Sequence, residues 1–275
     1  MTAQEFWRHL KDAGGYSSPE RRSRFLPTAR YYAGGIGVVI RARLRVLLSR
    51  YDRRAFEQSS FQSMRLIEKC GGRIEISGME HVAAIEGPVV FVSNHMSMLE
   101  TFVLPGLILP FKPVTFVIKQ DLLRYPLFGP VLSILQVIAV TRRNPREDFR
   151  EVLDKGVACL RSGVSVVVFP QSTRSVDFRP AFFNTLGVKL AAKADVPVIP
   201  VALRTDLQSN GRMLKDFGPI HPERTVHFCF GPALRIEGHG KAQHEQVVQF
   251  ISGRMQAWGV RVREAEGEPA ADPPV

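Results

Sequence analysis

The sequence predicts an α/β protein with a mostly parallel mixed sheet flanked by helices. After residue 73 the chain contains seven short apolar runs rich in β-branched residues: RIEISG, PVVFVSN, VTFVIK, VIAVT, VSVVVFP, VPVIPVAL and TVHFCFG. Continuous runs of this kind are typical of strands that are covered on both faces. Helical patterns occur between them, and such alternation indicates a parallel sheet with helical crossovers. We therefore expect an α/β domain over residues 73–262.

End signals place the helices between these runs. The clearest helix is expected over Arg146–Arg161, because Asn144-Pro145 supplies a start and Gly163 a stop. A second is expected over about Phe182–Lys193. The stretch Tyr125–Thr141 is uncharged, but proline and glycine break its first third. It is also shorter than the roughly 20 apolar residues that a spanning helix needs. We interpret it as a buried helix that leads into a strand, and we predict no transmembrane segment.

Residues 1–72 form a separate, basic and helical region in this interpretation. Residues 1–75 contain 15 Lys+Arg and 7 Asp+Glu, which accounts for +8 of the net charge of +11. A surface of this charge attracts phosphate groups on anionic lipid, nucleic acid or an acidic carrier protein. Two interpretations of the central helix remain open. It docks on a membrane, with Arg43 and Arg50 lying beside an apolar side that carries Val39, Val46 and Leu47, or it packs on the core with a solvated basic side. We favour membrane docking.

Cysteine content and the two ends of the chain indicate the compartment. Cys70, Cys159 and Cys229 are widely spaced, which does not fit a disulfide framework or a CxxC metal site. The N-terminus lacks the basic start and apolar core of a secretory signal. Residues 263–275 are rich in proline, alanine and acidic residues, and we expect a disordered tail. These features predict a protein at the cytoplasmic face of the membrane, bound peripherally.

The stretch VSNHMSMLET follows an apolar strand and contains His95 and Glu100. Ligands of an open α/β sheet bind beyond the carboxyl ends of its strands, so His95 is placed to act as a general base. If His95 precedes a helix and Glu100 lies in its first turn, the carboxylate can reach back and orient the imidazole. An alternative has equal support. Ser97 and Glu100 also fit a capping box, in which Glu100 serves only the helix end.

Cationic residues occur where three further strands end. The segment FPQSTRS, residues 169–175, places hydroxyl side chains on both sides of Arg174 and could hold a phosphate. Lys119 ends the VTFVIK run and Arg142 follows the VIAVT run. Each feature alone is more often an ordinary turn or a solvated charge. Because parallel strands end at one edge of a sheet, we expect these cations to lie on the edge that carries His95.

Taken together, these blocks resemble the glycerolipid acyltransferase family, which includes bacterial 1-acylglycerol-3-phosphate acyltransferases. The family has Asn-His, four residues and an acid, matched by Asn94-His95 and Glu100. It has a lysine block that leads through Pro and Gly to an apolar run and an arginine, matched from Lys119 to Arg142. Its Phe-Pro-Glu-Gly-Thr-Arg-Ser is matched by FPQSTRS, and its late Val-Pro block by VPVIPVAL. The order and spacing agree over about residues 73–205.

Three positions depart from the family pattern. Glu100 replaces the usual Asp and is one methylene longer, which still permits a bond to imidazole. Gln171 replaces Glu and Ser172 replaces Gly in the third block. These last two changes put the identity of the acyl acceptor in doubt more than the reaction.

The resemblance implies an O-acyltransferase in phospholipid biosynthesis or remodelling. His95 is then the general base, oriented by Glu100, and deprotonates the hydroxyl of a lysophospholipid that attacks a thioester. The implied substrate-binding residues are Lys119, Arg142, Gln171, Ser172, Thr173, Arg174 and Ser175. The donor is acyl-CoA or acyl carrier protein, and no metal ion or cofactor is implied.

Alternative functions stay open at this stage. One is an inactive or catalytically altered lipid-binding relative, and another is an acyltransferase for an acceptor that is not a glycerophosphate. The expected partners are the lysophospholipid, the acyl donor and an anionic membrane surface. Nucleic acid is not expected, because the arginine-rich segment matches no recognition motif.

Overall fold

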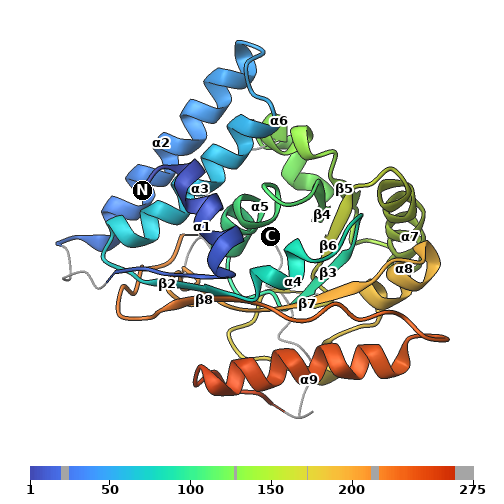
Figure 1. Cartoon of the computed structure of the whole chain (residues 1–275). Coiled ribbons are helices and arrows are strands. Elements are labelled where there is room, and N and C mark those ends of the chain that lie inside the picture. The colour runs from blue at the N-terminus through green and yellow to red at the C-terminus, as the bar shows by residue number, and fades with distance from the viewer. Residues whose placement is uncertain (20–24, 127–128, 172, 212–216, 264–275) are drawn as a thin grey trace.

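The computed structural model describes residues 1–19, 25–126, 129–171, 173–211 and 217–263. The described residues form an eight-stranded sheet in the order β1-β2-β8-β7-β3-β6-β4-β5, with helices on both faces (Figure 1). The strands are β1 (Tyr16–Ser17), β2 (Ile74–Ser77), β3 (Val90–Ser93), β4 (Val114–Lys119), β5 (Ile138–Val140), β6 (Ser165–Val168), β7 (Val198–Arg204) and β8 (Val226–Phe230). Every predicted apolar run is therefore a strand. Only β1 was not predicted, because its two residues are too few to form a pattern.

The strand directions confirm the mostly parallel mixed sheet. Strands β3 to β7 run parallel to one another, and β8 is antiparallel to β7. Val92 of β3 pairs with Val168 of β6 on one side and with Pro200 of β7 on the other. These three central strands are buried along almost their whole length. The parallel strands consequently end at one edge of the sheet, and the loops that follow them share that edge.

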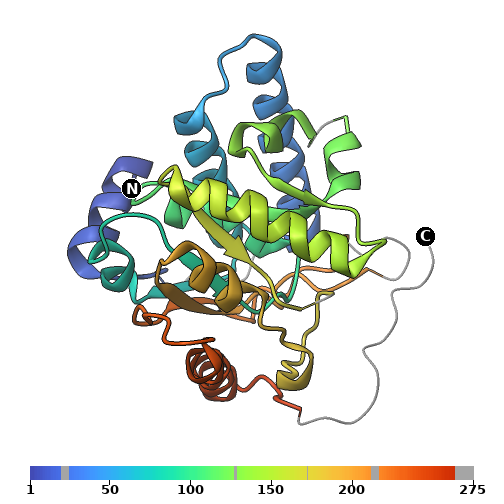
Figure 2. The ribbon, with the colours of Figure 1, turned by 90° about the vertical axis from the view of Figure 1, so that its right-hand side faces the viewer.

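The helices form a layer on each face of the sheet (Figure 1; Figure 2). One layer contains α1 (Ala3–Ala13), α4 (Met79–Ala83) and α5 (Leu99–Ile108), with α3 (Arg53–Lys69) against α5 and α2 (Pro27–Leu47) against α3. The other contains α7 (Pro145–Arg161), α8 (Leu186–Ala194) and α9 (Lys241–Ala257). The sheet core is thus covered on both sides, as its uninterrupted apolar strands require.

The bounds of one predicted crossover helix agree with the structure, and those of the other do not. Helix α7 agrees with the prediction: the Asn144 side chain accepts the N–H groups of Arg146 and Glu147, and Gly163 has a φ of 83°. Helix α8 begins at Leu186, four residues later than the expected start. Pro180–Phe182 forms a 3-10 turn instead (η3). The prediction was wrong there because the apolar pattern continues through the turn, whereas Asn184 accepts the Leu186 N–H and fixes the later start.

The buried helix expected within Tyr125–Thr141 was also wrong. The segment between β4 and β5 contains the 3-10 turn η1 (Gln120–Arg124), the four-residue α6 (Gly129–Leu132) and the 3-10 turn η2 (Ser133–Leu135). Gln136 has a φ of 49°, so the helical turn ends there and β5 begins two residues later. Among the described residues, no helix has both the length and the apolar character needed to cross a bilayer.

The N-terminal region is joined to the sheet as well as to the helices. Strand β1 pairs antiparallel with β2, and the buried Glu68 of α3 accepts hydrogen bonds from the hydroxyls of Tyr16 (2.6 Å) and Ser18 (2.8 Å). This buried carboxylate links the first strand to the helical layer. The predicted tail lies outside the described residues from 264 onward.

Candidate active site

Asn94 fixes the turn that follows β3. Its side-chain amide donates to the Leu203 carbonyl (2.8 Å) and accepts the Leu203 N–H (2.9 Å) on β7. Both hydrogen bonds are buried, so the side chain substitutes for a further step of the β3–β7 ladder. The residue after it is thereby held at the carboxyl edge of the sheet. That residue is His95.

His95 and Glu100 are in direct contact. Nδ1 of His95 lies 2.8 Å from Oε1 of Glu100, and the two side chains are 14% and 0% exposed. Glu100 lies in the first turn of α5, which begins at Leu99. An imidazole that donates its Nδ1–H to a carboxylate takes up a further proton at Nε2. The geometry is that of a general base with an orienting acid.

The Glu100 carboxylate is held ionised by several donors. The Met96 N–H donates to Oε1 (2.7 Å), and the Ser97 N–H reaches both oxygens (2.9 and 3.0 Å). The hydroxyls of Ser97 (2.9 Å) and Thr205 (2.6 Å) both contact Oε2. Burial alone would raise the pKa of this carboxyl group, but the bonds from His95, Thr205 and Met96 outweigh burial and lower the pKa. A negative charge is therefore available to stabilise an imidazolium.

The same carboxylate also serves the helix end, so the two interpretations of Glu100 are not exclusive. Glu100 accepts the Ser97 N–H, which is one half of the expected capping box. The other half differs from the prediction, because the N-cap is Met98 and the Ser97 hydroxyl accepts the Leu99 N–H (3.1 Å). Ser97 lies one position before the N-cap, so its hydroxyl does not form the bond expected of a capping-box serine.

The segment after β6 wraps around His95. Oε1 of Gln171 accepts the His95 N–H (2.7 Å), and the Ser175 N–H donates to the His95 carbonyl (3.0 Å). The Phe169 ring is stacked on the imidazole, with the ring centroids 4.5 Å apart. Two blocks separated by about 75 residues of sequence are thus assembled into one site, as β3 and β6 are neighbours. Ser172 lies outside the described residues.

The predicted cations lie on the same edge of the sheet as His95, but at different distances from it. Arg174 is half-buried, and Thr173 and Ser175 flank it on the segment that bonds to His95. Lys119 ends β4, the strand beyond β6, and forms an ion pair with Asp121 (2.9 Å). Arg142 follows the edge strand β5 and is exposed. At about 4.8 Å per strand, β5 lies roughly 14 Å from β3.

Sequence reasoning missed two residues of this site. Thr205 immediately follows β7 and contacts the Glu100 carboxylate, and Phe169 stacks on His95. A hydroxyl residue directly after a strand next to β3 was a usable signal for Thr205. Nothing in the sequence indicated the stacking of Phe169.

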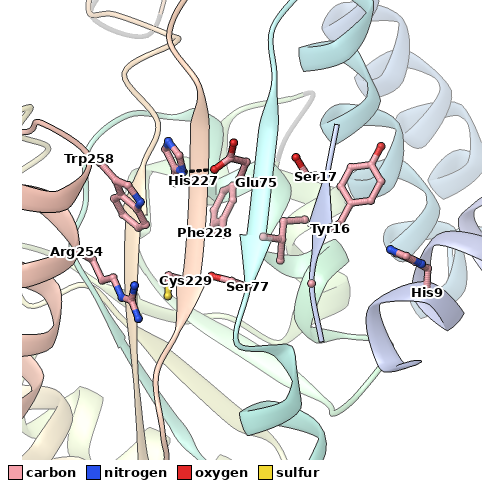
Figure 3. Close-up of a pocket in the computed structure, with 12 residues that line it drawn as sticks. His9, Tyr16, Ser17, Glu75, Ser77, His227, Phe228, Cys229, Arg254 and Trp258 are labelled. Carbon is pink, nitrogen blue, oxygen red and sulfur yellow. Dashed lines mark ion pairs between the residues drawn. The ribbon is translucent and has the colours of Figure 1, made fainter. Parts of the chain in front are cut away.

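A hollow of about 470 Å³ lies at the other end of the sheet, over β1, β2 and β8 (Figure 3). Its lining includes Glu75, His227, Cys229, Arg254 and Trp258, and none of its residues belongs to the His95 site. Nδ1 of His227 lies 3.2 Å from a carboxylate oxygen of Glu75. The hollow is therefore separate from the His95 site.

Comparisons with known proteins agree with this arrangement. A family model described as Acyltransferase matches residues 73–204. The 1-acyl-sn-glycerol-3-phosphate acyltransferase of Pseudomonas aeruginosa is 32% identical over 188 residues, which cover 68% of each chain. The chloroplastic 1-acyl-sn-glycerol-3-phosphate acyltransferase LPAT1 of Arabidopsis thaliana is 34% identical over 131 residues, 48% of this chain and 36% of that protein. The chain thus spans little more than a third of that plant relative.

A solved structure has the same fold. The crystal structure of the 1-acyl-sn-glycerophosphate acyltransferase PlsC from Thermotoga maritima superposes with a TM-score of 0.62 at 20% sequence identity. The superposition covers 86% of this chain and 96% of that one. The covered share of this chain is larger than residues 73–262 alone.

Proposed function

The chain belongs to the acyltransferase family, and we propose that it acylates the free hydroxyl of a 1-acylglycerol-3-phosphate-like lysophospholipid in phospholipid biosynthesis or remodelling. The observation that supports this most directly is the 2.8 Å contact between His95 and the buried, ionised Glu100. It lies at the carboxyl edge of the sheet, in the block order of the family. The relatives named above act on the same class of acceptor, by their names.

In the proposed mechanism, Nε2 of His95 takes the proton from the acceptor hydroxyl. The oxygen attacks the carbonyl carbon of an acyl thioester, so a C–O bond forms and the C–S bond breaks. The proton then passes from the imidazolium to the departing thiolate. Glu100 stabilises the imidazolium while it exists and keeps Nδ1 protonated throughout. The donor is acyl-CoA or acyl carrier protein, and the residues of this chain suffice for each proton transfer.

We assign the acceptor phosphate to Arg174. Its segment is hydrogen-bonded to the His95 backbone through Ser175, so a phosphate held there has its hydroxyl within reach of the imidazole. Lys119 and Arg142 lie one and two strands beyond β6 and suit the more distant phosphates of a donor. Gln171 contributes through the backbone of His95, and its neutral side chain does not repel an anionic acceptor.

Acyl transfer by the purified protein to a panel of lysolipids tests this assignment. We expect the highest kcat/KM with 1-acylglycerol-3-phosphate. Arg174→Lys retains the charge but loses the planar fork, so it should lose more activity on acceptors with a phosphate than on acceptors without one. Arg161→Lys, an exposed arginine on α7, is the matched control and should behave as the wild type.

Two outcomes would contradict the proposal. No transfer to any lysolipid from either donor would favour an inactive lipid-binding relative. An equal loss on both acceptor classes in Arg174→Lys would assign Arg174 to the donor or to the fold.

We further propose that helix α2 docks the enzyme peripherally on the anionic, cytoplasmic face of a membrane. Four apolar side chains form a stripe along the helix and are 45–63% exposed: Ile36, Ile40, Leu44 and Leu47. Arg41, Arg43 and Arg45 lie among them in the sequence. An exposed apolar stripe beside cations suits a lipid surface, since the cations bind head groups while the apolar residues enter the interface. Val39 and Val46, which we expected on this side, are half-buried instead.

Sedimentation with vesicles separates the two contributions of α2. Replacing Arg41, Arg43 and Arg45 by Gln should weaken binding to anionic vesicles by roughly 1 kcal/mol per charge. Replacing Ile40 and Leu44 by Gln should weaken binding to anionic and neutral vesicles alike. Arg161→Gln again serves as the control. Unchanged partitioning of both α2 variants at low salt would exclude α2 as the docking element.

A further inference from the structure

We infer that Thr205 is a positioning residue of the catalytic pair: its hydroxyl holds the Glu100 carboxylate in the orientation that serves His95. The inference rests on the proposed function, in which His95 is the base. Thr205 lies directly after the residues that the family model matches, 73–204. Its hydroxyl lies within bonding distance of Glu100 and Ser97, so it acts on His95 through Glu100.

The two carboxylate oxygens of Glu100 have different partners. Oε1 faces Nδ1 of His95 (2.8 Å) and the Met96 N–H (2.7 Å). Oε2 faces the hydroxyls of Ser97 (2.9 Å) and Thr205 (2.6 Å). The Thr205 contact is the shortest of these four, and Thr205 and Glu100 are both fully buried. A short bond from a hydroxyl to a buried carboxylate is among the stronger hydrogen bonds in proteins.

The two hydroxyls form a chain that ends on Oε2. The Thr205 hydroxyl has one proton, which goes to Glu100. The Ser97 hydroxyl also has one proton and lies 2.9 Å from both Oε2 and the Thr205 oxygen. When it donates to Thr205, the Ser97–Thr205 and Thr205–Glu100 bonds strengthen each other. Ser97 belongs to the turn after β3, whereas Thr205 belongs to the end of β7. Thr205 therefore restrains the carboxylate from outside its own segment.

The backbone of Thr205 is itself fixed. Its N–H points at Sδ of Met96 (3.2 Å), and its carbonyl accepts the Gln208 N–H (3.2 Å). The Thr205 hydroxyl therefore approaches Glu100 from a fixed direction. It bonds to Oε2, whereas His95 bonds to Oε1. Without the Thr205 hydroxyl, the Glu100 carboxylate can rotate about its last side-chain torsion. The carboxylate also loses one hydrogen-bond donor, so its negative charge interacts more strongly with His95.

Thr205→Val tests this, because valine has the shape of threonine but no hydroxyl. We expect kcat to fall by about tenfold, as for the loss of one bond to a charged group. KM for donor and acceptor should change by less than about twofold, since Thr205 contacts neither in the proposed mechanism. The acidic limb of the pH profile of kcat/KM should move to higher pH. A Glu100 carboxylate that lacks the Thr205 hydrogen bond stabilises the His95 imidazolium more strongly. Thr205→Ser restores the hydroxyl and should restore most of kcat and the position of the limb.

Thr115→Val is the matched control. Thr115 is also fully buried, and its hydroxyl donates to a main-chain carbonyl, that of Gln136 (3.1 Å). This variant should lower the melting temperature and leave kcat and the pH profile unchanged. A wild-type pH profile and kcat in Thr205→Val would overturn the inference, and so would an equal loss in Thr205→Val and Thr205→Ser.

A spectroscopic measurement keeps the test independent of turnover. The Nδ1 proton of His95, bonded to a buried carboxylate, should give a downfield proton NMR resonance that is absent from His95→Ala. We expect Thr205→Val to shift this resonance and Thr205→Ser to leave it near its wild-type position. An unshifted resonance in Thr205→Val overturns the inference even if the wild-type enzyme acylates none of the lysolipids, a result that would instead refute the proposed function.

Discussion

Two histidine–carboxylate pairs lie on the same sheet, and they share most of their local geometry. His95 contacts Glu100 at 2.8 Å, and His227 contacts Glu75 at 3.2 Å, through Nδ1 in both cases. Both histidine side chains are 14% exposed. Each ring is stacked on an aromatic ring, with centroids 4.5 Å apart for Phe169 and 4.7 Å apart for Trp258.

The carboxylates make the difference. Glu100 is fully buried and accepts hydrogen bonds from backbone and hydroxyl donors, which together lower its pKa. Glu75 is 42% exposed, and its other charged neighbour is Arg73 at 3.7 Å. A half-exposed carboxylate is screened by water and stabilises a partner charge weakly. Only the first pair has the buried, preorganised charge that a general base requires.

Position separates the pairs as well. His95 follows β3 at the carboxyl edge, where Gln171 after β6 bonds to its backbone and Thr205 after β7 bonds to Glu100. Glu75 and His227 face each other within the paired parallel strands β2 and β8, each as the second residue of its strand, beside the hollow shown in Figure 3. A histidine beside a carboxylate is therefore not a sufficient signature. In the proposed mechanism, His95 differs from His227 in its place at the strand ends and in the donors that bind its carboxylate partner.

The largest expected effect comes from removing each histidine in turn. His95→Ala should lower kcat by about 1,000-fold or more, because the general base is lost. His227→Ala is the matched control, and its kcat should stay within about twofold of the wild type, since nothing in the mechanism depends on it. Comparable losses of activity in the two variants, with both proteins folded by circular dichroism, would remove the functional distinction between the pairs.

The second comparison replaces each carboxylate by an amide. Glu100→Gln can retain an oxygen toward the Met96 and Ser97 N–H groups and place its NH₂ group beside the hydroxyls of Ser97 and Thr205. The helix end therefore keeps its acceptor, but the charge is lost. We expect kcat to fall by about 100-fold to 10,000-fold with a small change in melting temperature.

Glu75→Gln provides the control for that change and should leave kcat unaffected. If Glu100→Gln instead retained wild-type activity and lost only stability, Glu100 would be a helix cap and nothing more. Activity and melting temperature measured on the same samples distinguish the two outcomes.

Much of this architecture could be predicted because it depends on local pattern. The apolar runs specified seven of the eight strands of the described sheet, and the strand-end rule located His95, Lys119, Arg142 and Arg174 at one edge. Distances along that edge could not be predicted. They depend on strand order, and β6, late in the sequence, lies between β3 and β4.

The errors have physical causes of the same kind. The helix expected before β5 is a pair of short turns, since Gln136 adopts a left-handed conformation that hydropathy does not reveal. Of the three apolar residues expected on the exposed side of α2, Leu47 is exposed, whereas Val39 and Val46 are half-buried. The residues that pack inward are Val38 and Ala42, which the sequence pattern did not indicate. Thr205 is 105 residues from Glu100 in sequence, and only the pairing of β3 with β7 brings them together.

The smallest expected effect is the pH dependence of stability at His227. Burial lowers the pKa of this histidine, with Arg204 and Arg73 acting in the same direction, and Glu75 and Asp206 offset them only in part. The folded protein therefore binds a proton at His227 less readily than the unfolded chain, in which a histidine takes up its proton at the ordinary pKa of about 6.5. Because the unfolded state then binds more protons, stability contributed by this site is lost as the pH falls below about 6.5.

His227→Gln cannot take up that proton, so its melting temperature should fall less than that of the wild type between pH 7.5 and pH 5.5, by about 1–2 °C. The exposed His239→Gln should follow the wild type. A wild-type protein that gained stability relative to His227→Gln on acidification would show that Glu75 binds a charged His227, and the two pairs would then be electrostatically alike.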